Sequence, residues 1–151
     1  MSLKQLGKTK YTESVVVGSV DMSTDPTNYK RSVCIVAFAS GDTVATGDGT
    51  VGFCVPGWMN GLNLTDVDIS VATAGATSGT TDVQIRRRRG AAVADMLTTK
   101  VTLATSTYTS SNGVVNGAND DLATGDIIFA DVDAVNGTPP VGLFVTLTFS
   151  N

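Results

Sequence analysis

The chain has 151 residues, of which 16% are charged, and its formal net charge is −4. That length suits one compact domain, which buries roughly two-thirds of the surface that its unfolded chain exposes. Histidine is absent, which excludes catalytic triads, general bases and metal sites that use an imidazole. Thirteen of the fourteen acidic residues are Asp, and Gly occurs 16 times. Asp and Gly are typical of turns, whereas the abundant Val and Thr are typical of strands, so we expect an all-β chain.

The first thirteen residues lack the alternation of a strand. They contain Lys4, Lys8 and Lys10, with no acid before Glu13. We expect an extended basic arm over residues 1–13 and a single sandwich domain over residues 14–151. The arm lacks the apolar core of a signal peptide, and no run of about eighteen apolar residues occurs anywhere, so we expect a protein made in the cytoplasm that does not bind membranes.

Alternation of apolar and polar residues between turn signals predicts about eight strands. An antiparallel two-sheet β-sandwich of the jelly-roll type is favoured by these short strands and by the lack of a convincing helix. An immunoglobulin fold fits less well, because Cys34 and Cys54 are too close in sequence and Trp58 lies outside its pattern. The expected strands are residues 14–20, 32–39, 50–55, 62–71, 81–88, 97–104, 126–134 and 141–149.

Four consecutive arginines end the strand expected at residues 81–88. Alternation places Arg87 and Arg89 on the same face as the core residue Ile85, and Arg86 and Arg88 on the opposite face. Arginines on the core side require either that the strand leaves the sandwich or that a partner supplies carboxylates. We expect a protein-docking patch rather than a solvated strand end. Nucleic acid is disfavoured because aromatic stacking residues are missing nearby and the sequence pI is about 4.5.

The charges of the chain are unevenly distributed. Residues 101–151 contain five acids and no Lys or Arg, whereas residues 1–10 carry three lysines. The basic arm and the arginine edge could therefore contact an acidic assembly while an acidic surface faces solvent.

Two pairs of carboxylates suggest acid-base chemistry or a metal. Asp66 with Asp68, and Asp131 with Asp133, are spaced two residues apart on strands, about 7 Å along one face. An inverting glycosidase uses such a pair, but both pairs are expected to face solvent, where nothing separates their pKa values. The oxygen-rich loop that could hold calcium lacks EF-hand order and is better explained as turns. Its residues are Asn119, Asp120, Asp121 and Asp126. We therefore expect no enzyme activity, metal or cofactor.

Cys34 and Cys54 lie in apolar runs, "VCIVAF" and "VGFCVP", without neighbouring ligands for zinc. We expect two buried thiols, with a disulfide between adjacent strands as the alternative. Trp58, in "PGWMNG", is either an exposed anchor for a sugar or a protein, or a cap over one end of the sandwich.

Several segments between residues 50 and 150 resemble small jelly-roll modules of tailed-bacteriophage virion proteins. The segments are "VQIR", "DMLTTKVTL", "NDDLATGD", "DVD" and "GLFVTLTF". Similar modules occur as head decoration or cement proteins and as parts of head or tail fibres, and as a class they are not enzymes. The run of arginines departs from the resemblance, which implies a milder polar turn there.

The resemblance implies a virion structural protein on the capsid surface, made in the host cytoplasm. As a single module with a basic arm, the chain is expected to be a decoration protein that bridges capsomers through its arm and one sandwich edge. Its expected partner is the major capsid protein or another virion protein, and its expected oligomer is a homotrimer at three-fold positions. The alternative is a fibre or a receptor- or carbohydrate-binding module, with Trp58 and residues 105–125 as the ligand-binding candidates.

Overall fold

The computed structural model describes residues 16–17, 20–21 and 30–151. The lysines of the expected arm, Lys4, Lys8 and Lys10, lie outside the described residues, as does most of the strand expected at residues 14–20. The structure has two short strands there instead of one, since β1 (Val16–Val17) pairs with β2 (Val20–Asp21) in an antiparallel sheet of two strands.

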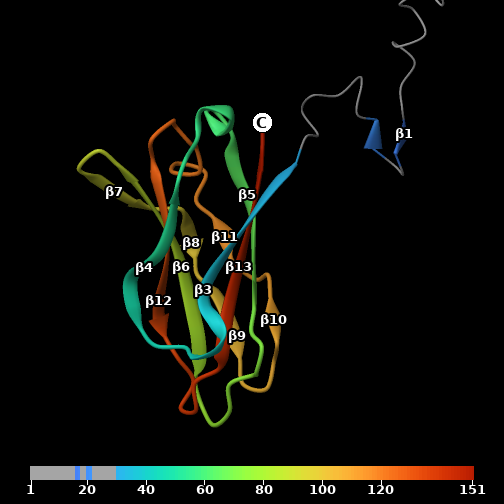
Figure 1. The fold of residues 1–151 in the computed structure, drawn as a ribbon, viewed down its shortest axis with the longest axis vertical. Helices are drawn as coiled ribbons and strands as arrows, with labels where there is room; N and C mark the ends of the chain where they lie inside the picture. The colour runs from blue at the N-terminus through green and yellow to red at the C-terminus, as the bar shows by residue number, and fades with distance from the viewer. Residues whose placement is uncertain (1–15, 18–19, 22–29) are drawn as a thin grey trace, which may run out of the picture.

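Two antiparallel sheets make up the body of the protein (Figure 1). The order in sheet 1 is β10 (Thr109–Ser110), β5 (Asn63–Ser70), β13 (Val141–Ser150) and β3 (Arg31–Thr43). The order in sheet 2 is β4 (Gly47–Cys54), β12 (Ile127–Ala134), β6 (Thr80–Arg89) and β7 (Ala92–Asp95), and β9 (Val101–Ala104) also pairs with β6. A short separate pair is formed by β8 (Leu97–Thr99) and β11 (Val114–Val115). The prediction of an all-β antiparallel chain is therefore confirmed.

One hydrophobic core lies between the two sheets. Strand β13 contributes alternate residues, and Leu143, Val145 and Leu147 are all fully buried. From sheet 2, buried Val, Ile and Ala side chains of β6 and β12 join the same cluster. Across the sandwich, the rings of Phe53 on β4 and Phe149 on β13 meet edge to face, with centroids 6.5 Å apart. The period-two patterns of the sequence thus mark the inner faces of both sheets.

The strand expected at residues 97–104 is divided in two. Its first part, β8, pairs with β11, and its second part, β9, pairs with β6. Strands β7, β10 and β11 were not expected, because two to four residues are too few to show alternation. The helical element η3 (Gly57–Met59) has three residues, and no helix in the described part of the chain is long and apolar enough to cross a membrane.

A loop over residues 116–126 closes one end of the sandwich. Backbone hydrogen bonds join it to the start of β5 and the residue before it: the Leu64 N–H donates to the Asp120 carbonyl at 2.8 Å, and the Leu122 N–H donates to the Leu62 carbonyl at 2.8 Å. Val55 directly follows β4, and its N–H donates to the Asp126 carbonyl at 2.8 Å. These bonds fix the loop beside the end of β6, where the arginines lie.

Candidate functional site

The four arginines occupy the last four positions of β6. Arg86 and Arg87 lie opposite Phe129 and Ile128 of β12 in the register of the sheet. Side chains alternate along a strand, so Arg87 and Arg89 lie on the inner side of β6, where Arg87 is buried and Arg89, at the end of the strand, is exposed, while Arg86 and Arg88 lie on the outer side. The structure therefore divides the run into an inner pair and an outer pair, as the sequence pattern predicts.

The inner pair binds carboxylates of the same chain. Arg87 Nη1 donates to both the carbonyl oxygen and Oδ1 of Asp121. Arg89 donates to Asp126 at two points, from Nε to Oδ1 at 2.9 Å and from Nη2 to Oδ2 at 2.7 Å, and its Nη1 reaches Asp121 Oδ2 at 2.9 Å. We call these four residues the Arg–Asp network. A partner was expected to supply the carboxylates, but the loop over residues 116–126 supplies them for both inner arginines.

Ionisation in the network follows from these contacts. The hydrogen bond from Arg87 is the main cause that lowers the pKa of Asp121, against the opposing effect of desolvation. The hydrogen bond from Arg89 is the main cause that lowers the pKa of Asp126, although the Asp126 side chain is only 2% exposed. The hydrogen bond to Asp126 is the main cause that raises the pKa of Arg89, and the hydrogen bond to Asp121 is the second. These contacts therefore favour the charged forms of both carboxylates and of Arg89, and they oppose the effect of burial on Asp126.

The outer pair flanks an aromatic ring. The guanidinium carbons of Arg86 and Arg88 lie 5.8 Å and 5.7 Å from the centroid of the Phe129 ring. Arg86 also pairs with Asp131, with Nε 2.8 Å from Oδ2. Arg88 is exposed and has no ion pair with any residue that the structure describes. Opposite Arg88 in the sheet lies Val93, which is 54% exposed. We call Arg86, Arg88, Phe129 and Val93 the Arg–Phe face.

The expectation that both Asp pairs face solvent was wrong for Asp131, which is 3% exposed. The tight turn at Gly49 covers it, and the Gly49 N–H donates to its carboxylate. Burial raises the pKa of Asp131, and the Gly49 N–H and Arg86 oppose that rise. Its pair member Asp133 is exposed and forms a salt bridge with Lys100 at 2.8 Å.

The other acidic candidates do not gather into a site. Among the described residues, no group of three or more Asp, Glu, Cys or His side chains is placed to hold a metal ion. Asp121 and Asp126, two members of the possible calcium set, bind arginines instead. Asp66 accepts a hydrogen bond from the N–H of its own neighbour Val67.

Trp58 is exposed on η3, and 59% of its surface is accessible. The guanidinium of Arg31 lies 5.0 Å from its ring centroid, and Arg31 Nη1 donates to the Trp58 carbonyl at 3.1 Å. Of the two expected roles, this exposure fits an anchor better than a cap over the core.

The prediction of buried thiols was wrong, since Cys34 and Cys54 are both exposed and free. The apolar runs around them belong to strands whose outer faces meet solvent. Ile35 and Val55 are buried, whereas each cysteine occupies the alternate, outward position. The two cysteines lie on β3 and β4, which belong to different sheets.

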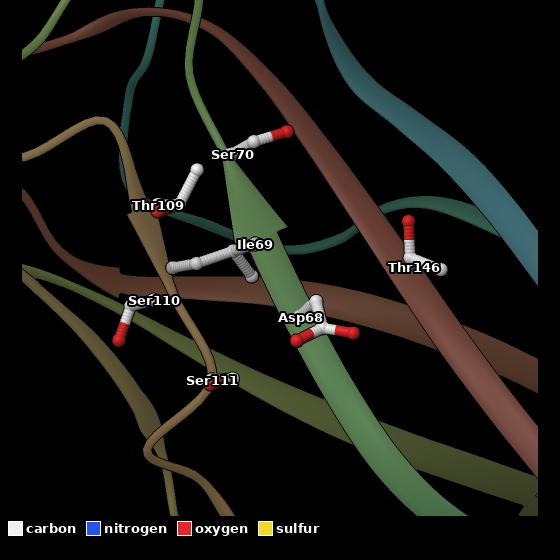
Figure 2. Close-up of a pocket in the computed structure, with 7 residues that line it drawn as sticks. All are labelled: Asp68, Ile69, Ser70, Thr109, Ser110, Ser111 and Thr146. Carbon is white, nitrogen blue, oxygen red and sulfur yellow. The ribbon is translucent and has the colours of Figure 1, made fainter.

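A groove lies at the edge of sheet 1, where β10 ends beside β5 (Figure 2). Its volume is about 380 Å³. The groove is lined by Asp68, Ile69, Ser70, Thr109, Ser110, Ser111 and Thr146. Three of these residues fall within the loop region proposed from the sequence as a ligand-binding candidate, but Trp58 does not line the groove.

Sequence reasoning missed the roles of Asp121, Asp126 and Phe129. The alternation placed two arginines on the core side, where carboxylates were one of the two options, and "NDDLATGD" is an acidic segment later in the chain that could have supplied them. Phe129 alternates with the buried Ile128 and Ala130, a signal that it faces outward beside the arginines.

No protein-family model matches the sequence, and no curated protein matches it.

Proposed function

We propose that this chain is a non-enzymatic virion structural protein, a decoration or cement protein that binds the outside of an assembled phage head and bridges capsomers. The single observation that carries this proposal is the state of Arg88. Its three neighbours in the run are neutralised by Asp121, Asp126 and Asp131, whereas Arg88 stays exposed beside Phe129. An exposed arginine beside a partly buried aromatic ring is typical of the residues that dominate protein interfaces.

We further propose that the sandwich is a jelly roll. If the β1–β2 pair, the hairpin strand β7 and the β8–β11 pair are set aside, eight main strands remain, four in each sheet. They lie in the orders β10, β5, β13, β3 and β4, β12, β6, β9. The chain crosses between the sheets at nearly every connection, which supports two Greek keys, the arrangement of a jelly roll. Jelly rolls are common in viral shells.

The Arg–Asp network supports the proposed role because it makes the docking edge rigid. It joins the end of β6 in sheet 2 to a loop that is bonded to the start of β5 in sheet 1. A rigid edge loses little conformational entropy when it binds, so small contacts repeated by symmetry add up to firm attachment. The partner is the major capsid protein or another virion protein, and a homotrimer at three-fold positions is the proposed assembly.

Two measurements test this proposal. Quantitative mass spectrometry of particles purified from the source gives the copy number relative to the main shell protein; a lattice-wide ratio is expected, and a vertex or fibre ratio of a few copies per particle overturns it. Co-sedimentation with stripped heads then compares Arg88→Ala with Lys100→Ala, which also removes one exposed positive charge, in this case one that is paired with Asp133. Arg88→Ala is expected to weaken binding about tenfold, because exposed interface arginines contribute on the order of 1 to 2 kcal/mol. If both variants weaken binding to heads equally, the Arg–Phe face is not part of the contact with the shell.

A further inference from the structure

The groove at the edge of sheet 1 is lined by polar side chains, most of which have no hydrogen-bond partner among the described residues. Strand register places Thr146 opposite Asp68, and Thr109 opposite Ser70. Residues that lie directly opposite each other in an antiparallel pair point to the same face, so these four side chains share the outer face of sheet 1. Figure 2 shows the Asp68 carboxylate between the Thr146 hydroxyl on β13 and the segment of residues 109–111 on the other side of β5.

Most of these groups keep their hydrogen-bonding capacity. The Ser110 hydroxyl donates to the Thr102 carbonyl at 2.8 Å. The other polar side chains of the groove form no side-chain hydrogen bond or salt bridge with the residues that the structure describes, and they are Asp68, Ser70, Thr109, Ser111 and Thr146. One carboxylate and four hydroxyl-bearing side chains without such partners therefore line one hollow. A few convergent polar groups in a concavity are what orient a small ligand.

The chemistry of these groups defines the ligand class. An ionised carboxylate only accepts hydrogen bonds and can take two of them from neighbouring hydroxyls, whereas Ser and Thr hydroxyls both donate and accept. A ligand that fits must therefore offer several hydroxyls close together. Asp68 disfavours an anion, because like charges repel without a cation in the groove. A divalent cation such as Ca²⁺ needs six to eight oxygen ligands, usually with several carboxylates, and the groove has one carboxylate.

We propose that this groove binds a neutral hexose unit of a saccharide, with Asp68 as the acceptor for two adjacent sugar hydroxyls and Thr146 and Ser70 as flanking partners. The groove volume of about 380 Å³ lies within the roughly 300 to 1,000 Å³ of small-molecule sites. The site lies on sheet 1, whereas the Arg–Phe face lies on sheet 2. Sugar binding is thus a second activity beyond shell binding, and neither depends on the other.

The same strands supply matched controls. Asp66 and Thr148 lie opposite each other on the same outer face, two residues along from Asp68 and Thr146, and they do not line the groove. Asp68→Asn and Thr146→Val change the groove with minimal change in shape, and Asp66→Asn and Thr148→Val make the same chemical changes beside it. All four positions are on the surface, and circular dichroism confirms that each variant is folded.

The experiment is a ¹⁵N NMR titration of the full chain with glucose, galactose, mannose and N-acetylglucosamine, and with N-acetylneuraminic acid as the anionic comparison. At least one neutral sugar is expected to shift the amide resonances of residues 68–70, 109–111 and 146. Asp68→Asn and Thr146→Val are each expected to raise its Kd about tenfold, the effect of one hydrogen bond to or beside a charged group. The control variants and Arg88→Ala are expected to bind like the wild type.

Three results overturn the proposal. The first is the absence of shifts at these residues with every neutral sugar. The second is an equal loss of affinity in the groove variants and in their neighbours at positions 66 and 148. The third is sugar binding that disappears in EDTA and returns with Ca²⁺, which would assign the groove to a cation. Arg88→Ala is measured both in co-sedimentation with heads and in the sugar titration. A loss of shell binding can therefore be distinguished from a loss of sugar binding.

Discussion

Arg89 and Asp126 form a two-point ion pair at one end of the sandwich, with Nε 2.9 Å from Oδ1 and Nη2 2.7 Å from Oδ2. The Asp126 side chain is 2% exposed, whereas that of Arg89 is 41% exposed. The carboxylate of this pair is therefore shielded from water, whereas the guanidinium is still in contact with it. An ion pair of this kind fixes the loop of residues 116–126. Its removal should lower the free energy of unfolding, because the carboxylate has few other partners.

We expect Asp126→Asn to lower the free energy of unfolding by about 2 kcal/mol. The variant keeps the side-chain shape but loses the charged acceptor for Arg89 and weakens the bond from the Ala123 N–H. Urea denaturation at pH 7 measures the change. Asp120→Asn, six residues away in the same loop and without a salt bridge among the described residues, is the control and should change stability by less than about 0.5 kcal/mol. A loss of similar size in the control would show that the loop, and not the ion pair, is the sensitive feature.

Acid should remove the contribution of the network. The pKa values of Asp121 and Asp126 are lowered in the folded state by hydrogen bonds from Arg87 and Arg89. Their stabilisation is therefore fully present above the unfolded pKa of about 3.9 and is lost as the pH falls through the folded values. The difference in unfolding free energy between the wild type and Asp126→Asn should be constant from pH 7 to about pH 5 and should shrink below about pH 4. A difference that stays constant down to pH 2 would contradict this assignment.

Asp131 should show the opposite trend. Burial raises its pKa, so the folded state holds a proton more tightly than the unfolded state does. Its contribution to stability therefore increases as the pH falls from the raised folded pKa toward about 3.9. Asp131→Asn, which keeps an acceptor for the Gly49 N–H, should cost about 1 kcal/mol or less at pH 7. As the pH falls from 7 to 4, the free energy of unfolding of the wild type should rise relative to that of Asp131→Asn, measured by urea denaturation. A fall over the same range would show that the folded state stabilises Asp131 as an ion.

Gly52 allows β4 to approach β12 closely. A Cβ atom at this position would lie 2.3 Å from the Ile128 carbonyl oxygen and 2.9 Å from Cδ1 of Phe129. Gly52→Ala must therefore displace backbone, and we expect a loss of about 2 kcal/mol, measured by thermal unfolding. Gly41→Ala is the control, because nothing lies within 4 Å of a Cβ at that position. Because Phe129 must also move, Gly52→Ala should weaken shell binding, whereas Gly41→Ala should not.

The sequence predicted most of the strands that carry the core, because alternation over eight to ten residues is visible in β6, β12 and β13. It also predicted correctly that Arg87 and Arg89 point inward. It did not identify their partners, since Asp121 and Asp126 are 34 and 37 residues further along the chain and no local pattern connects them. Burial of the cysteines was mispredicted for a related reason: a run of apolar residues does not show which face of a strand another sheet covers.

The positions of β12 and β13 determine when the protein can fold. Each lies at the centre of its sheet, between strands that precede it in the chain: β13 between β3 and β5, and β12 between β4 and β6. The pairing of β13 with β3 joins residues as far apart as Ser32 and Thr148, which are 116 positions apart. Contacts this distant are slow to form, because a long loop must close before they stabilise anything. During synthesis each central strand leaves the ribosome after both strands that it joins, so the facing edges of β4 and β6 stay unpaired until β12 emerges, and those of β3 and β5 until β13 emerges.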